Sequence, residues 1–417
     1  MKIHSVLIPA FSALAGLALQ GLPATAADSR PTLKDTYKDS FKIGVAINRQ
    51  QVFATPGLRA DNASGSQDQL NKDVALIKEQ FNQISPENDL KWEMIQPYEG
   101  PTGYSFRAAD AYVNFGLSNN MYIVGHTLVW HSQTPGWVFS PTNTPPPEGW
   151  NPDDGGGRRG GGGGFGGGRG RGGPGGPQAS RDQVLQRMHD HIMTVVGRYK
   201  GKIKCWDVVN EAIDDGGTNI LRNSQWKQTI GEDFIAKAFT YAHEADPDCL
   251  LRYNDYSLEN SSKRHKLITM IKSLQDQHIP VGAIGTQTHV SVSSPSFAQE
   301  DQALTEIESL GLPIHVTEFD VNSAQGGQRN TGADVAANAS TTTGGLVSQA
   351  DQKLADAYTG LFNAFLKHKK SVQVITFWGV NDRVSWRASG RPLLFDGNDE
   401  PKAAFDAVIK AHADYKP

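Results

Sequence analysis

The sequence predicts an α/β fold in which eight parallel strands close into a single barrel, and three observations predict it. Short apolar segments alternate with longer amphipathic segments from residue 41 to the C-terminus. The short segments are rich in Val and Ile without clean alternation, as is typical of strands buried on both faces. Eight strand–helix pairs in succession imply parallel pairing with right-handed crossovers, and eight is the number that closes a (β/α)8 TIM barrel.

The predicted strands and helices follow one another in alternation. The strands cover residues 42–47, 81–88, 121–130, 202–211, 249–256, 281–289, 313–321 and 373–380. The helices, with apolar side chains three or four positions apart, cover residues 68–80, 109–118, 181–199, 233–245, 261–278, 297–310, 349–368 and 403–413. A doubly wound open sheet is the alternative, but no Gly-rich dinucleotide-binding turn follows the first strand.

Composition separates a folded body from an insertion. The chain has 417 residues, of which 38% are hydrophobic, which suffices for a sizeable core and excludes wholesale disorder. Its formal net charge of −4 is too small and too balanced to indicate a protein that binds nucleic acids or membrane surfaces. Sixteen of the 44 glycines lie between residues 155 and 176. Because residues 141–180 are rich in Pro, Gly and Arg and lack apolar periodicity, we predict a flexible, disordered insertion after the third strand.

The N-terminus has the features of a secretory signal peptide over residues 1–26. Lys2 supplies the positive start, residues 6–22 are largely apolar, and residues 24–26 are small enough for a cleavage site. A membrane anchor is the alternative, although Pro9 and Gly16 interrupt the apolar stretch, and no later stretch has the length of a transmembrane helix. We therefore expect a secreted or periplasmic protein, without membrane contact after cleavage, whose catalytic domain spans residues 27–417.

Only two cysteines are present, Cys205 and Cys249. This number excludes a disulfide-rich scaffold and a zinc site built on paired thiols. The sequence leaves open whether the two cysteines form one disulfide bond or remain buried thiols.

Polar side chains gather where the predicted strands end. Such a pattern is unusual for packing alone, but it is expected of a barrel enzyme, whose active site lies at the carboxyl ends of the strands. The strand ends read Ser85-Pro86-Glu87-Asn88, Trp130-His131-Ser132-Gln133, Asn210-Glu211, Asn254-Asp255, Gln287-Thr288-His289, Glu318-Phe319-Asp320 and Phe377-Trp378.

Two carboxylates, Glu211 and Glu318, end the fourth and seventh strands. Those strands face each other across an eight-membered ring, so both side chains can approach one point. Paired carboxylates that flank a bond are typical of glycoside hydrolysis, in which one is protonated and the other ionised. Metal binding is the competing use, but no His-x-x-x-His or Asp-rich loop accompanies them. No metal or cofactor is expected.

Four tryptophans near the strand ends, Trp92, Trp130, Trp378 and Trp386, offer flat apolar faces for sugar rings. Packing in the core is the alternative for each of them. Their position beside Asn, Gln, His and Lys favours a carbohydrate cleft.

The strand-end residues also carry a resemblance to a known family. The chain resembles the family 10 glycoside hydrolases, retaining endo-β-1,4-xylanases, from about residue 41 to the C-terminus apart from the insertion. The motifs that carry it, in the family's order, are Glu87-Asn88-x-x-Lys91-Trp92, His126-Thr-Leu-Val-Trp130-His131-Ser-Gln133-Thr-Pro135, Trp206-Asp207-Val-Val-Asn210-Glu211-Ala212, Gln287-Thr-His289, Val316-Thr317-Glu318-Phe-Asp320 and Phe377-Trp378-Gly-Val-Asn381-Asp382.

The resemblance implies a role for each matched residue. Glu211 would be the general acid/base and Glu318 the nucleophile, with their carboxyl groups about 5–5.5 Å apart. Asn210 would bond the 2-hydroxyl of the sugar, and His289, supported by Asp320, would hold Glu318 ionised. The residues that match the family's glycone-side pocket are Glu87, Asn88, Lys91, His126, Trp130, Gln133, Gln287, Trp378 and Trp386.

The resemblance therefore implies a monomeric endo-1,4-β-xylanase acting on xylan and xylooligosaccharides by double displacement. A related retaining glycanase acting on cellulose or mixed-linkage glucan would have the same catalytic pair. An RNA-binding protein whose Gly-Arg repeats bind the RNA is the alternative from another functional class, but the acidic charge of the rest of the chain argues against it.

The insertion departs from the short connection that the family has at this position. It is either a loop that contacts acidic, glucuronate-decorated xylan through Arg158, Arg159, Arg169 and Arg171, or a neutral expansion.

Overall fold

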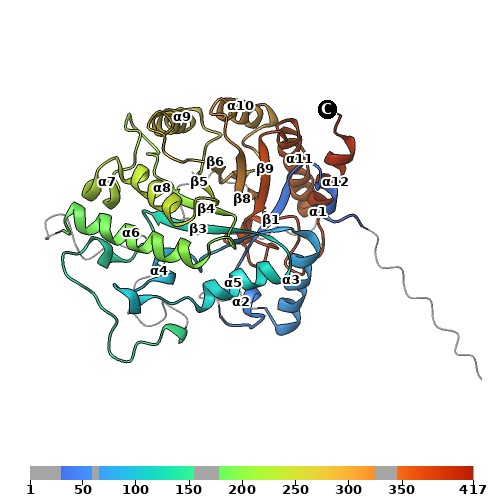
Figure 1. Ribbon diagram of the computed structural model, residues 1–417. Coiled ribbons are helices and arrows are strands. Elements are labelled where there is room, and N and C mark those ends of the chain that lie inside the picture. The colour runs from blue at the N-terminus through green and yellow to red at the C-terminus, as the bar shows by residue number, and fades with distance from the viewer. Residues whose placement is uncertain (1–29, 59–64, 155–177, 325–344, 417) are drawn as a thin grey trace, which may run out of the picture. The chain divides into compact units, whose positions relative to one another are not determined.

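Eight parallel strands form the wall of a closed barrel in the computed structural model, which describes residues 30–58, 65–154, 178–324 and 345–416 (Figure 1). β1 pairs with β9 and β6 pairs with β8, so the sheet has no open edge between its first and last strands. This arrangement confirms the predicted (β/α)8 barrel. The strands are β1 (Lys42–Ile47), β2 (Gln83–Pro86), β3 (Tyr122–Trp130), β4 (Cys205–Asn210), β5 (Leu250–Asp255), β6 (Ala283–Thr286), β8 (Ile314–Asn322) and β9 (Val372–Phe377).

The sixth predicted strand, residues 281–289, is divided into two. β6 ends at Thr286 and pairs with the start of β8. A separate short strand, β7 (His289–Ser291), pairs with the end of β8. The prediction of one continuous strand was wrong because Thr288 adopts a left-handed backbone conformation, with φ of 54°. This break turns Gln287 and His289 toward the mouth of the barrel.

A ring of helices surrounds the strands (Figure 1). Side-chain caps start several of them: Ser180 and Ser296 each form a reciprocal capping box with a Gln three residues later. The main helices are α3 (Gln67–Gln80), α5 (Arg107–Ser118), α6 (Arg181–Arg198), α8 (Phe234–Ala245), α9 (Ser261–Asp276), α10 (Phe297–Glu308), α11 (Gly345–Lys367) and α12 (Ala403–Asp414). Shorter helices are α1 (Leu33–Thr36), α2 (Arg49–Phe53), α4 (Trp92–Ile95) and α7 (Gln225–Ile230).

The core lies between the barrel wall and this ring. Helix α6 buries Val184, Met188 and Ile192, and Phe319 of β8 packs edge-on against Tyr358 and Phe365 of α11. Each such side chain contributes about 1.5–3 kcal/mol when it is fully buried. Packing on both faces of the sheet explains the unbroken apolar strands of the sequence.

The start of the predicted flexible insertion is hydrogen-bonded to the barrel. The backbone of Thr144 exchanges two hydrogen bonds with Glu99, and Ser105 donates to the Pro152 carbonyl. Ser180 at the other end caps α6. The two ends of the predicted insertion thus have defined hydrogen-bond partners. The Gly-Arg repeats at 155–177 lie outside the described residues, as do the predicted signal peptide and residues 325–344.

The two cysteines are unpaired in the structure: Cys205 is buried in β4, and Cys249 lies just before β5. Across the described ranges, no helix has the length and apolar character needed to cross a membrane.

Candidate active site

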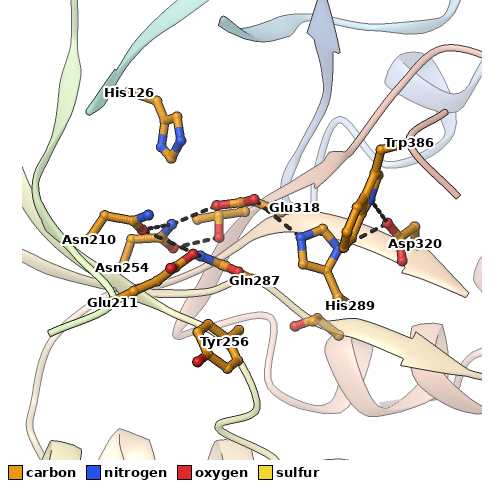
Figure 2. A network of polar contacts seen from close by, with 12 residues as sticks. His126, Asn210, Glu211, Asn254, Tyr256, Gln287, His289, Glu318, Asp320 and Trp386 are labelled. Atoms are coloured by element: carbon orange, nitrogen blue, oxygen red, sulfur yellow. Dashed lines mark hydrogen bonds and ion pairs between the residues drawn. The ribbon is translucent and has the colours of Figure 1, made fainter. Parts of the chain in front are cut away.

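Two carboxylates and a set of amides meet at the carboxyl end of the barrel strands (Figure 2). Asn210 ends β4, and Glu211 follows it in a left-handed backbone conformation, with φ of 56°. The Glu211 backbone N–H donates to the Asn254 carbonyl of β5 at 2.9 Å. A positive φ is uncommon for a residue with a side chain, and such strain is typical of functional sites. The Glu211 carboxylate lies between Trp130 of the neighbouring strand β3 and Gln287, which follows β6.

Glu318 is buried in β8 and accepts hydrogen bonds on both carboxylate oxygens. Asn254 Nδ2 donates to Oε1 at 2.8 Å, and His289 Nε2 lies 3.2 Å from Oε2. Burial raises the pKa of the Glu318 carboxyl. The bond from His289 and the charges of His126, His289 and Lys91 lower it by more than burial raises it, so the pKa lies below its ordinary value. Glu318 is therefore held ionised.

His289 lies between Glu318 and Asp320 (Figure 2). Its Nδ1 is 2.9 Å from Asp320 Oδ2. Burial lowers the pKa of His289, but the Asp320 charge and the hydrogen bonds to both carboxylates raise it to about 9. An imidazolium donates from both ring nitrogens, so one cation joins the two carboxylates. Asp320 is held in turn by Trp386 Nε1 at 2.8 Å and Arg387 at 2.8 Å.

Glu211 has different partners. Trp130 Nε1 donates to its Oε2 at 2.8 Å, and Gln287 Nε2 donates to its Oε1 at 2.8 Å. Both donors are neutral, whereas one of the donors to Glu318 is a cation. The two carboxylates thus have environments of different charge, which is the arrangement needed to give them different tasks.

Asn210 is joined to each carboxylate through one amide, since Asn254 also donates to Glu318 and Gln287 also donates to Glu211. The Asn210 Oδ1 accepts from Asn254 at 2.9 Å and from Gln287 at 3.4 Å, which fixes the orientation of the amide. Among the described residues none accepts a hydrogen bond from the Asn210 amide nitrogen, so it is available to a ligand. Gly285 makes room for this bridge, because a Cβ there would lie 2.4 Å from Asn254 Oδ1.

The remaining predicted pocket residues lie in two groups beside this centre. Lys91 Nζ donates to Asn88 at 3.0 Å and to Gln133 at 2.9 Å, and it lies over the Trp130 ring. Burial lowers the pKa of Lys91. The second group lines a recess formed by Glu87, Trp378 and Trp386 together with Asn48. The structure therefore brings these pocket residues to one end of the barrel. Trp92 is the exception among the predicted tryptophans: it is buried and stacks on His191 of α6 with ring centroids 3.7 Å apart, so the expectation that it faces a sugar was wrong.

A second polar network lies one layer deeper in the barrel. Arg252 of β5 forms two hydrogen bonds with Asp207 of β4, at 2.7 and 2.9 Å, and a third with His315 at 2.9 Å. Asp207 also bonds His126 at 3.0 Å. Burial lowers the pKa of His315 to about 3, so it stays neutral and accepts from Arg252. His126 links the layers, because it bonds Asp207 below and its ring packs edge-on against Trp378 of the pocket, with centroids 5.5 Å apart.

Sequence reasoning missed two residues of the site. Asn254 was visible only as a polar strand end, yet it bonds both Asn210 and Glu318. Arg387 gave no signal, since it follows Trp386 in a loop. Trp130 was expected to offer its ring to a sugar, and its indole N–H also donates to Glu211.

Within the described residues, no group of three or more His, Cys, Asp or Glu side chains could hold a metal ion.

Comparison with known proteins places these residues in a family. The family model described as glycosyl hydrolase family 10 matches residues 32–411. A beta-1,4-xylanase of Dictyoglomus thermophilum is 35% identical over 387 residues, which cover 91% of each chain.

Solved structures agree with this match. A GH10 endoxylanase from a sugarcane soil metagenome is 34% identical with a TM-score of 0.73, over 91% of this chain and 99% of the other. The intracellular xylanase TsXylA of Thermoanaerobacterium saccharolyticum, solved as a mutant with xylotetraose, is 33% identical with a TM-score of 0.71, over 92% and 99%. With its barrel, its strand-end carboxylates and a family match over nearly the whole chain, this protein belongs to glycosyl hydrolase family 10.

Proposed function

We propose that this protein is an endo-1,4-β-xylanase that cleaves internal bonds of xylan with retention of configuration. The observation that carries the proposal is the pair of unlike carboxylates: Glu318 is held ionised by an imidazolium, and Glu211 is bonded by neutral donors. The xylanases among the similar proteins support xylan as the substrate.

The mechanism has two displacements. In the first, a Glu318 oxygen attacks the anomeric carbon while Glu211 transfers its proton to the departing glycosidic oxygen. In the second, Glu211 takes a proton from water, and the water oxygen attacks the same carbon and releases Glu318. The Asn210 amide nitrogen donates to the 2-hydroxyl of the reacting sugar. A bond of this kind strengthens in the transition state and so lowers the barrier.

The test is the stereochemistry of the first product. Proton NMR of a xylooligosaccharide digest should show the β-anomer first, with the α-anomer appearing only by mutarotation. An α-anomer formed first would overturn the retaining mechanism. Parallel assays on xylan, carboxymethylcellulose and mixed-linkage glucan measure the substrate preference, and faster hydrolysis of either glucan would overturn the assignment to xylan.

We also propose that the chain is exported and acts as a monomer. Residues 1–26 have signal-peptide features, and every group of the catalytic centre comes from one chain. N-terminal sequencing of protein from the periplasm or medium should begin near residue 27. An intact Met1 on active intracellular enzyme would contradict export, and a dimer mass in light scattering would contradict the monomer.

A further inference from the structure

A groove of about 790 Å³ lies on the outer flank of the barrel, away from the residues of the catalytic centre. Its walls come from residues 101–107, from helix α5, from Arg198 at the end of α6 and from residues 150–153. The last segment is the described start of the insertion. None of the lining residues is among those that form the catalytic hydrogen-bond network or the recess beside it.

Trp150 is the half-buried aromatic side chain that the insertion adds to this groove. Its Nε1 donates to the Thr102 carbonyl at 3.1 Å, and its ring packs edge-on against Tyr98 with centroids 4.9 Å apart. The Arg107 guanidinium fixes the following turn by donating to the Asp153 carbonyl at 2.8 Å. The indole is therefore held in place before any ligand binds, which lowers the entropic cost of binding.

The charges in the groove compensate one another. Arg198 donates to both carboxylate oxygens of Asp110, at 2.9 and 2.6 Å. The complete lining holds two arginines and two aspartates, so it has no net charge. A polyanion such as RNA needs an excess of basic side chains, which this groove lacks.

The groove also presents polar groups that a neutral ligand can bond. Asn114 is exposed on α5, and within the described residues its amide has no hydrogen-bond partner. The Thr102 hydroxyl is likewise exposed at the rim. A fixed indole beside neutral donors and acceptors suits a sugar ring, which has an apolar face and hydroxyl groups at its edge.

We propose that this groove is a second binding site for an uncharged xylan chain, with Trp150 as its stacking platform. The identity of the polysaccharide rests on the proposed function, whereas the neutral, sugar-binding character rests on the groove itself. Contact at a second site holds the polymer near the cleft after each dissociation, and so raises the apparent affinity for long chains without new contacts at the catalytic centre.

The test compares polymer binding with turnover of a short substrate. Trp150→Ala should keep its kcat/KM on xylotetraose, because the groove and the catalytic centre share no residues. In native gels that contain soluble, unsubstituted xylan, this variant should be retarded less than the wild type. The difference should correspond to a roughly tenfold weaker affinity for xylan, as expected for the loss of one large aromatic contact. Asn114→Ala, in an exposed helical position, is the second variant and should weaken retardation in the same direction. Tyr241→Ala removes a half-buried aromatic of α8 that does not line the groove, and it should bind xylan like the wild type.

Wild-type retardation of both Trp150→Ala and Asn114→Ala, with unchanged melting temperatures, would overturn the proposal. So would an equal loss of xylotetraose turnover in Trp150→Ala, since the effect would then belong to the catalytic cleft. If the wild type does not hydrolyse xylan, the proposed function fails. A Trp150-dependent retardation by another neutral β-1,4-linked polysaccharide would then still support the groove as a sugar site.

Discussion

Two polar networks lie one above the other inside this barrel, and they are built on different principles. In the deeper layer, Arg252 directs three hydrogen bonds at Asp207 and His315, which closes the network on itself. In the upper layer, the Asn210 amide nitrogen has no acceptor among the described residues, and Glu318 accepts one hydrogen bond on each carboxylate oxygen, from Asn254 and from His289. The open hydrogen-bonding capacity of the upper layer fits the substrate binding proposed for it. The closed layer beneath holds His126 and the strand register in place.

The largest expected effect is on the upper layer. Glu318→Ala should lower kcat on xylan by roughly 10⁵-fold, because the attacking oxygen is lost and no neighbouring group can replace it. The free energy of unfolding should fall at neutral pH, since the ionised Glu318 carboxylate, whose pKa is lowered in the fold, no longer accepts from Asn254 and His289. Steady-state kinetics and urea denaturation measure the two quantities. A loss of activity below tenfold would show that Glu318 is not the nucleophile.

The next effect concerns stability and lies in the deeper layer. Arg252→Met removes the guanidinium that compensates the buried Asp207 carboxylate and leaves it only the bond to His126, and should reduce the free energy of unfolding by about 3–5 kcal/mol. Asp207→Asn/Arg252→Met, which removes the stranded charge, should be less destabilised than Arg252→Met in urea denaturation. If the double variant were the less stable of the two, burial of an uncompensated charge would not be the cause.

A smaller effect is expected from the cation that serves Glu318. His289→Asn removes the positive charge that lowers the pKa of Glu318, so the acidic limb of kcat/KM should move up by about one pH unit. Activity at neutral pH should fall roughly 10- to 100-fold, because Glu318 also loses its positioning bond. His315→Asn, a histidine of the deeper layer without contact to Glu318, is the matched control. An acidic limb that moves equally in both variants would contradict the assigned role of His289.

The smallest effect is on the pH dependence of stability. The pKa of His289 is raised from its ordinary 6.5 to about 9, so its stabilising contribution is complete below pH 6.5 and is lost as the pH rises through 9. The lowered pKa values of Glu318 and Asp320 act in the opposite direction, with stability lost as the pH falls through them. Between pH 7 and 10 the wild type should lose roughly 2–4 °C more in Tm than His289→Asn. Parallel curves for the two proteins would show that His289 is not protonated in the folded state.

Local patterns of the sequence were sufficient for the architecture. The spacing of apolar residues depends only on neighbours along the chain, and it predicted the barrel with most of its strands and helices. The carboxylates Glu211 and Glu318 were also recognisable, because parallel strands deliver their last residues to the same end of a barrel. The exception is the strand over residues 281–289, where the left-handed Thr288 interrupts a regular apolar pattern.

The contacts that distinguish the two carboxylates were decided by the tertiary structure. Asn254 reaches Glu318 across 64 positions of sequence, and Trp386 reaches Asp320 across 66. Such pairs depend on strand register and on how each loop returns over the barrel mouth, which no local pattern contains. The same holds for the unpaired Cys205 and Cys249 and for Trp150, whose packing against Tyr98 gives the start of a glycine-rich insertion a fixed place on the barrel. Composition and periodicity determined the barrel and its catalytic end. The charge environments of the two carboxylates and the groove followed only from the tertiary structure, because both arise between residues that are far apart in the sequence and meet only on folding.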